Sequence, residues 1–433
     1  MISSRTLPET QPRSLLARQS LRTAQRTVLL ATMFCYLFYY TGRHAFGFAI
    51  PGIEEELGLS KLTLGWVSTA LLWCYALGQI PSGYLGDRVG GRIMMSSGAC
   101  LSCGLNWIFS MTNGFWGLLV PWGMNGFAQS MGWAPGSRVL ANWWPSNERG
   151  KIYGCYLFAA SMGSVLSYVT SILILKFELD WRWIFRLPVL SMVMGGVTYY
   201  LIVRDRPDQA GFEPPSDSDA PASKPENADE NEKAWESYRE VLSHGRFLVA
   251  SWAIGFQSIA RYGLLFWVPV HFLGSDWKQE GGSWISVALP VGMAFGALTS
   301  GWLSDRVFRS RRAPVIVLFM GLAAAFSVAM YFIPKEQGTL GLIVLFLCGF
   351  FVYGPQSAFW ALCPDLLGVK RTGTGTGIMN FHAYFFAGLG EPFIGWMIDS
   401  SESVDGRPQT AIIFLVVAVA CMASASISLF IKR

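Results

Sequence analysis

Residues 43–51, RHAFGFAIP, have a counterpart in residues 261–269, RYGLLFWVP, and this pair sets the architecture of the chain. In both stretches an arginine lies inside a long apolar segment and a proline follows eight residues later. The same spacing of 218 residues separates GYLGDRVGGR, which begins at Gly83, from GWLSDRVFRSRR, which begins at Gly301. Three landmarks at one spacing indicate an internal repeat of two equivalent halves.

The composition is that of a membrane protein. Hydrophobic residues make up 52% of the 433 residues and charged residues only 14%, whereas an average soluble domain has about 25% charged residues. Apolar stretches recur from Thr27 to Ile431, which excludes a soluble multidomain enzyme. The net charge of +5 comes from short basic groups between these stretches, so it reflects membrane topology and not a nucleic-acid partner.

The apolar stretches predict the fold class. A bilayer core of about 30 Å requires roughly 20 apolar residues per helix, and twelve stretches meet that length. They are predicted at 27–50, 62–86, 93–111, 115–142, 151–175, 184–203, 247–273, 284–304, 314–333, 339–363, 374–398 and 410–431. We therefore predict an all-α integral membrane protein with twelve transmembrane helices in two pseudo-symmetric six-helix halves. A site between such halves can open to each side of the membrane in turn.

The charged or Gly/Pro-rich stretches between the apolar ones divide the chain into segments. We predict an N-terminal tail (1–26), a first six-helix bundle (27–203), a linker (204–246) and a second bundle (247–433). The linker is polar, acidic and Pro-rich, which predicts disorder. Lys and Arg concentrate in the loops on the side of the tail, so the positive-inside rule places both termini in the cytoplasm. The first 26 residues are polar and Arg-rich without a cleavage site, so we expect an inner-membrane protein with an uncleaved N-terminus.

Charges inside the spans point to the ligand. Insertion of an arginine at the bilayer centre costs at least about 2.5 kcal/mol on insertion scales. We therefore expect each such arginine to face the protein interior and to have a structural or functional role. The repeat aims Arg43 and Arg261 at one central cavity, where two guanidinium groups repel unless an anion lies between them. Pairing with acids is the alternative, but Glu391 is the only acid predicted well inside a span. The pattern favours a site for phosphate or a dicarboxylate.

Three further titratable residues have open roles. Arg138 lies five residues before Trp143, and it is predicted to brace or gate the cytoplasmic side or to contact substrate. Glu391 is predicted either to carry a proton or to pair with Arg261. His382, nine residues earlier on the same span, is a candidate to bind phosphate or a proton.

Uncharged polar residues on the same spans complete the predicted substrate site. The tyrosines before Arg43 and the glutamine before Arg261 lie at helical spacings from those arginines, although packing between helices is the alternative for the tyrosines. The predicted set is Tyr39, Tyr40, Gln79, Gln257, Tyr353 and Gln356. His44 and His271 are weaker candidates, because a residue adjacent to Arg43 on a helix points about 100° away and an interfacial histidine is usually solvated.

The motifs resemble a known family. The D-R-x-G-G-R segment at 87–92, partly repeated at 304–306, resembles the cytoplasmic loop signature of the major facilitator superfamily. Four stretches resemble the organophosphate:phosphate antiporters, namely GWAPGSRVLANWWPSNERGK (132–151), RDRPDQAGFEPP (204–215), RYGLLFWVP (261–269) and YGPQ (353–356). The resemblance extends over about residues 24–432. It implies that Arg43 and Arg261 bind the phosphoryl group of an organic phosphate, which is exchanged for inorganic phosphate as in glycerol-3-phosphate and hexose-phosphate transporters.

Two departures and one paired motif refine that expectation. Gln79 stands where the bacterial glycerol-phosphate carriers have Lys, and Ala160 stands where they have His, which is compatible with a shift in substrate. At equivalent places of the repeat, two Asp-Arg pairs follow the second and eighth spans, and we predict that they act in conformational switching. These pairs are Asp87 with Arg88 and Asp305 with Arg306.

Other functions remain as alternatives. A proton-coupled symporter of sugar acids or other organic anions also carries an Arg in span one and one near the end of span four, as Arg138 is here. A non-transporting membrane sensor of a sugar phosphate is the second alternative. The sequence has no P-loop, nucleophile elbow or metal cluster, so we expect no enzyme, cofactor or metal, and transport driven by gradients. The expected partners are a small organic phosphate, inorganic phosphate and the bilayer, with a monomeric chain.

Overall fold

The computed structural model describes residues 20–213, 234–273, 281–309, 311–334, 337–367, 372–401 and 408–431. Within these ranges the chain is helical and contains no strand, which confirms the predicted all-α class. Residues 1–19 of the predicted tail and residues 214–233 of the predicted linker lie outside the described part.

The predicted spans fall on single helices or on consecutive ones. In the first half these are α1 (Leu21–Tyr39), η2 (Tyr40–Gly42), α2 (Phe46–Leu57), α3 (Lys61–Val89), α4 (Gly91–Met111), α5 (Gly114–Trp143), α6 (Ser146–Lys176), η3 (Trp181–Phe185) and α7 (Leu190–Ile202). In the second half they are α9 (Gly245–Leu273), η5 (Gly281–Val287), α10 (Ala288–Arg306), α11 (Arg312–Phe332), α12 (Gly338–Tyr353), α13 (Gln356–Leu367), α14 (Thr372–Asp399), η7 (Gln409–Ala411) and α15 (Ile412–Ser428). Of the described helices, 7 are long and apolar enough to cross a membrane. The number twelve stays a prediction.

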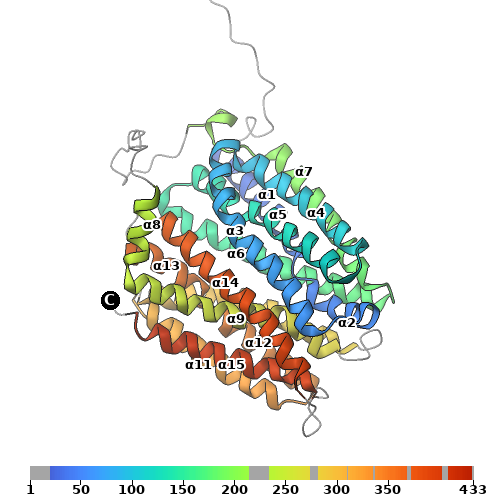
Figure 1. Ribbon diagram of the computed structural model, residues 1–433. Coiled ribbons are helices and arrows are strands. Elements are labelled where there is room, and N and C mark those ends of the chain that lie inside the picture. Colours follow the sequence, from blue (N-terminus) through green and yellow to red (C-terminus); the bar gives the residue numbers. More distant parts are fainter. Residues whose placement is uncertain are drawn as a thin grey trace, which may run out of the picture.

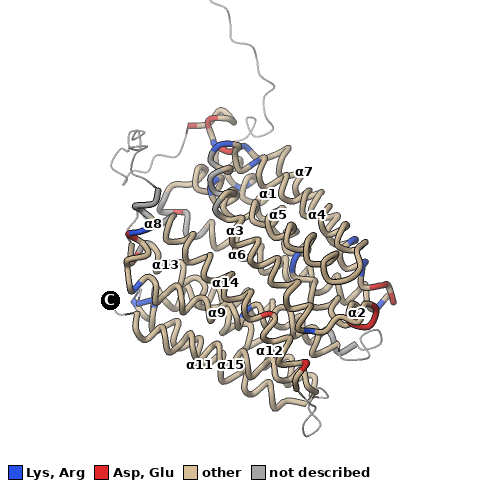
Figure 2. The backbone as a smooth tube through the Cα atoms, viewed as in Figure 1, with Lys and Arg blue, Asp and Glu red and all other residues tan. Residues whose placement is uncertain are grey.

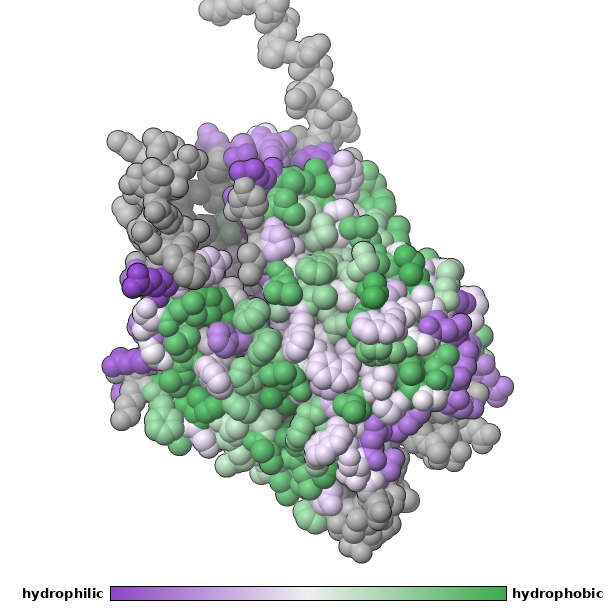
Figure 3. Space-filling model, viewed as in Figure 1, coloured by the Kyte–Doolittle hydropathy of each residue, from purple (hydrophilic) through white to green (hydrophobic). Residues whose placement is uncertain are grey.

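The two halves lie side by side, and α3 of the first packs along α14 of the second (Figure 1). The end of the bundle where α1 and α9 begin and α3 and α15 end is named here the terminal end, and the opposite end, with α2, the far end. Charged residues gather at these two ends (Figure 2), and mainly apolar residues cover the visible face between them (Figure 3). This distribution is typical of a surface that faces lipid.

At the terminal end, the motif at 87–92 contacts the motif at 204–215. Gly90 ends α3 and starts α4 with a φ of 95°, a conformation that favours glycine. The Asp205 carboxylate accepts a hydrogen bond from the backbone N–H of Arg92 at 2.7 Å. A Cβ at Gly90 would lie 2.4 Å from Asp205 Oδ2, so only glycine allows this approach.

The predicted linker contains more structure than expected. Helices η4 (Asp208–Ala210) and α8 (Ala234–Ser243) lie within 204–246, so the prediction of a wholly disordered linker is wrong there. Val241 is fully buried and Tyr238 packs against the core, because these apolar side chains lie on one face of a short amphipathic helix.

The first predicted span is broken where continuity was expected. Between α1 and α2 the chain turns through η2, and the carbonyl of Gly42 accepts hydrogen bonds from the side-chain amides of Asn106 (3.2 Å) and Asn125 (2.8 Å). Gln129 donates to the carbonyl of Tyr39 at 3.0 Å. Buried backbone groups released from a helix must find such partners, so amides from α4 and α5 make the break possible. Span ten is likewise interrupted at Gly354, between α12 and α13.

Candidate functional site

Two buried arginines face aromatic rings at the centre of the molecule. Arg43, directly after η2, is 2% exposed, and its Cζ lies 4.0 Å from the ring centre of Tyr40 and 5.2 Å from that of Tyr75. Arg261, within α9, is 7% exposed and lies 4.5 Å from the ring of Tyr353. The Nε atoms of both arginines have no hydrogen-bond partner, and neither guanidinium forms an ion pair with a described carboxylate. Aromatic faces are their principal electrostatic partners in the described part.

Tyrosines from both halves join the two arginines into one surface. The ring of Tyr384 on α14 lies 4.4 Å from that of Tyr75 and 5.6 Å from that of Tyr262. A cavity of about 40 Å³ lies between these residues. It is lined by Tyr36, Tyr40, Tyr75, Trp133, Leu157, Ser258, Arg261, Tyr262, Tyr353, Gln356, Trp360, Asn380, Ala383 and Tyr384. Such a cavity holds only a few waters, so a larger ligand requires it to widen.

Several predicted site residues do meet here. Tyr40, Tyr353 and Gln356 line the cavity together with Arg261. Gln356 Oε1 is buried without a hydrogen-bond partner, as is Gln79 Nε2 on α3. The interruption of span ten places Tyr353 at the end of α12 and Gln356 at the start of α13. Broken helices of this kind commonly line transport sites.

Three predicted substrate residues brace the fold instead. Tyr39 donates from its hydroxyl to the carbonyl of Met95 at 2.6 Å, and Gln257 donates to the carbonyl of Val352 at 2.9 Å. His382 Nδ1 lies 2.8 Å from the carbonyl of its own helix at Ile378. Consecutive helical positions point about 100° apart, so sharing a helix with a cavity residue did not place these side chains in the cavity.

The predicted switching residues lie at the terminal end. Arg88 and Arg306 are exposed there, and the side chains of Asp87 and Asp305 lie outside the described part. Arg138 on α5 is also exposed, and its bracing, gating or substrate-binding role stays a prediction. A long side chain five residues from the helix end reaches the surface, as snorkelling predicts.

Glu391 is buried beside a tryptophan and not beside an arginine. Glu391 is only 1% exposed, and its Oε2 accepts a hydrogen bond from Trp267 Nε1 at 2.9 Å. Its Oε1 has no partner. Arg261 lines the cavity, and Trp267 is the only hydrogen-bond partner of this carboxylate among the described residues. Of the two predicted roles, the pairing with Arg261 is therefore wrong, and that of a proton carrier stays a prediction.

We expect Glu391→Gln to preserve the melting temperature and substrate exchange within about twofold, and to remove any proton-driven accumulation. The amide carbonyl can accept the bond from Trp267 but cannot release a proton. Melting curves, exchange and proton uptake on this variant provide the measurement, with Trp267→Phe as a control that retains the carboxyl group. A loss of about 3–5 kcal/mol of stability would contradict the expectation, because it marks a broken buried ion pair.

Two residues of the site, His44 and Tyr384, were not in the predicted substrate set. His44 Nδ1 lies 2.9 Å from Ser164 Oγ, its Nε2 is buried without a partner, and it lines a small cavity with Arg261. His44 was given little weight because adjacent residues of a continuous helix point about 100° apart. The helix is not continuous here, since the break at η2 changes the direction of the side chains. Helical spacing could have identified Tyr384, since Asn380, Tyr384 and Glu391 lie on one face of α14.

On the far-end side of the cavity, the two halves pack closely. Thr69 donates from its hydroxyl to the carbonyl of Gly388 at 2.6 Å, and Trp73 Nε1 donates to the carbonyl of Phe385 at 3.1 Å. Asp399 Oδ2, at the end of α14, accepts from the backbone N–H of Leu62 at 2.8 Å. These contacts join α3 and α14 on the far-end side of the cavity.

Comparison with known proteins identifies the fold family. The family model of the Major Facilitator Superfamily matches residues 32–391. The chain belongs to this superfamily. This facilitator is 28% identical over 386 residues to the glycerol-3-phosphate transporter of Bacillus subtilis, with 86% of each chain covered. It is 28% identical to a probable hexose phosphate transport protein of Chlamydia pneumoniae, covering 92% of this chain and 88% of the relative.

Other relatives of this facilitator differ in role. A membrane sensor protein of Escherichia coli, UhpC, is 24% identical over 389 residues, which cover 86% of this chain and 84% of the sensor. Among solved structures, a bacterial homologue of the human lysosomal transporter Spinster, in an inward-facing and unoccupied conformation, superposes with a TM-score of 0.73. It covers 94% of this chain and 95% of its own at 15% identity, so the likeness concerns the fold. The expected resemblance to organophosphate transporters is confirmed.

Proposed function

We propose that this facilitator exchanges an organic phosphate for inorganic phosphate by alternating access. The observation that carries the proposal is the pair Arg43 and Arg261, both buried, both turned to one tyrosine-lined region, and neither paired with a described carboxylate. A phosphoryl group with several oxygens would cancel their repulsion and accept bidentate hydrogen bonds. Relatives named for glycerol-3-phosphate and hexose phosphate support this substrate class.

We assign the organic part of the substrate to uncharged hydrogen-bonding groups. Tyr40, Tyr353 and Gln356 line the cavity, and His44 presents an unpartnered Nε2 next to Arg261. Hydroxyl and amide groups suit a hydroxylated substrate, because they can both donate and accept. Since Gln79 and Ala160 replace charged or titratable residues of the glycerol-phosphate carriers, the clamp of two arginines supplies the charge recognition.

Alternating access is supported by the packing of the halves. We propose that 27–203 and 247–433 rock against each other, with the terminal end in the cytoplasm of an inner membrane and the far end closed in this conformation. The Asp-Arg pairs 87–88 and 305–306 then act at the cytoplasmic ends of α3 and α10 during the switch. Their equivalent places in the repeat support that role.

Counterflow in proteoliposomes tests the proposed function. Vesicles are loaded with inorganic phosphate and labelled phosphate is offered outside; we expect uptake to depend on internal phosphate and to be inhibited by an organic phosphate such as glycerol-3-phosphate. Uptake that follows pH without internal counter-substrate would identify a proton-coupled symporter. Binding of a sugar phosphate without any transport would identify a sensor.

A further inference from the structure

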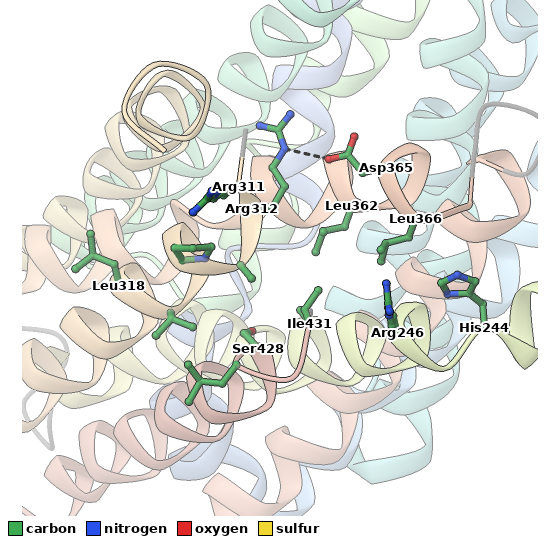
Figure 4. A pocket seen from close by; sticks show the side chains of 14 residues that line it. His244, Arg246, Arg311, Arg312, Leu318, Leu362, Asp365, Leu366, Ser428 and Ile431 are labelled. Carbon is green, nitrogen blue, oxygen red and sulfur yellow. Dashed lines mark hydrogen bonds and ion pairs between the residues drawn. The ribbon is translucent and has the colours of Figure 1, made fainter. Parts of the chain in front are cut away.

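A large pocket lies away from the central cavity, at the terminal end of the second half. Its volume is about 1080 Å³, and it lies between the beginnings of α9 and α11 and the ends of α13 and α15. The charged and titratable lining residues are His244, Arg246, Arg311, Arg312 and Asp365. Figure 4 shows Arg246 entering this space from α9, while Leu362 and Leu366 point toward it from α13.

The charges in this pocket are unbalanced. Arg312 Nε pairs with Asp365 Oδ2 at 3.3 Å, and Arg312 Nη1 donates to Ser304 Oγ at 2.8 Å. The side chains of Arg246 and Arg311 make no hydrogen bond or ion pair with another described residue. Among the described lining residues, one acid therefore faces three arginines, which leaves donors for an anion.

Neutral donors reinforce the basic groups. His244 Nδ1 accepts a hydrogen bond from the backbone N–H of Phe247 at 3.3 Å, so the proton of the neutral ring lies on Nε2. Helix α11 begins at Arg312 without a side-chain cap, which leaves the backbone N–H groups of Arg312 and Ala313 as donors, whereas Pro314 has none. The positive end of its dipole also favours negative charge.

Apart from Ser428, the rest of the wall is formed by apolar residues, which favours an anion that carries apolar chains. Leu318 is 42% exposed and Leu429 is 63% exposed, and Leu362, Leu366 and Ile431 continue the surface. A hydrated free phosphate would leave these side chains uncovered, whereas acyl chains would cover them. Basic pockets between helices at the cytoplasmic surface suit anionic headgroups.

We propose that this pocket binds an anionic phospholipid, with its phosphate at Arg246 and Arg311 and its acyl chains along α11, α13 and α15. The site is separate from the proposed transport cavity, so it does not depend on the transported substrate.

Native mass spectrometry of the purified full chain with phosphatidylglycerol tests the site. We expect Arg246→Gln and Arg311→Gln each to raise the apparent Kd about fivefold and the double variant about 25-fold, following the usual contribution of a basic residue near an anionic surface. Arg239→Gln is the matched control, since Arg239 is exposed on α8 and does not line the pocket. Phosphatidylcholine should bind more weakly and should not distinguish the variants.

Melting curves without added lipid show whether each variant is folded, and Arg246→Lys should retain most of the binding because it keeps the charge. The proposal is overturned if the double variant binds phosphatidylglycerol as tightly as Arg239→Gln does. It is also overturned if inorganic phosphate alone stabilises the protein as strongly as the lipid and loses this effect in the double variant. That result would assign the pocket to a free anion.

Discussion

Arg43→Lys and Arg261→Lys should each weaken phosphate binding by about 100-fold although the positive charge is kept, because a lost charge-assisted hydrogen bond costs about 1.5–3 kcal/mol. Lysine is a point donor and cannot present the planar fork that accepts a phosphoryl group bidentately. The loss should be similar at both positions, since each guanidinium lies over tyrosine rings beside the proposed cavity. Binding of labelled phosphate to purified protein gives the measurement.

Arg92→Lys provides the matched control for these two variants. Arg92 also stacks on a tyrosine, with its Cζ 4.2 Å from the ring centre of Tyr200, and it donates to the carbonyl of that residue at 2.6 Å. It lies at the start of α4, outside the cavity, so its replacement should leave phosphate affinity unchanged. Near-normal affinity in Arg43→Lys or Arg261→Lys would contradict bidentate phosphate binding and would show that positive charge alone attracts the phosphate.

Gly395→Val should lower exchange by more than about tenfold, because adding bulk to a tightly packed contact typically costs 1–3 kcal/mol or more. A Cβ at Gly395 on α14 would lie 2.3 Å from the carbonyl oxygen of Lys61 on α3, and one at Gly47 would lie 2.1 Å from that of Phe266. Both contacts join the two halves at the far end, where backbones approach closely only through small residues. Valine should hold this end open and stop the cycle, while phosphate binding persists.

Gly377→Val is the matched control on the same helix, since nothing lies within 4 Å of a Cβ at that position. Exchange rate and phosphate affinity are measured on both variants. A cysteine introduced at the cavity residue Ser258 also reports, by its reactivity toward a reagent added from the far side, whether that side is open. Normal exchange in Gly395→Val would show that closure of the far end is not part of the cycle.

Much of the architecture followed from the sequence because its signals can be found in the chain without knowing which helices pack together. Apolar length alone indicates helices that cross a bilayer, and the spacing of 218 residues revealed the repeat without any knowledge of packing. Arg43 and Arg261 could be singled out for the same reason, since an arginine within an apolar span is costly wherever the helix lies. Both are buried in the structure, beside tyrosines that line one cavity.

The identity of the other cavity residues depended on tertiary structure. The rotation of each helix turns Tyr384 into the cavity and Gln257 toward a backbone carbonyl, and periodicity on one helix does not fix that rotation. The bend after Tyr39 exists because amides of α4 and α5 satisfy the freed carbonyls, and it brings His44 beside Arg261. The sequence by itself determined that the chain crosses the membrane as a repeat with two buried guanidinium groups. Only the packing of distant helices decided which uncharged groups surround them, because those contacts join residues far apart in the chain.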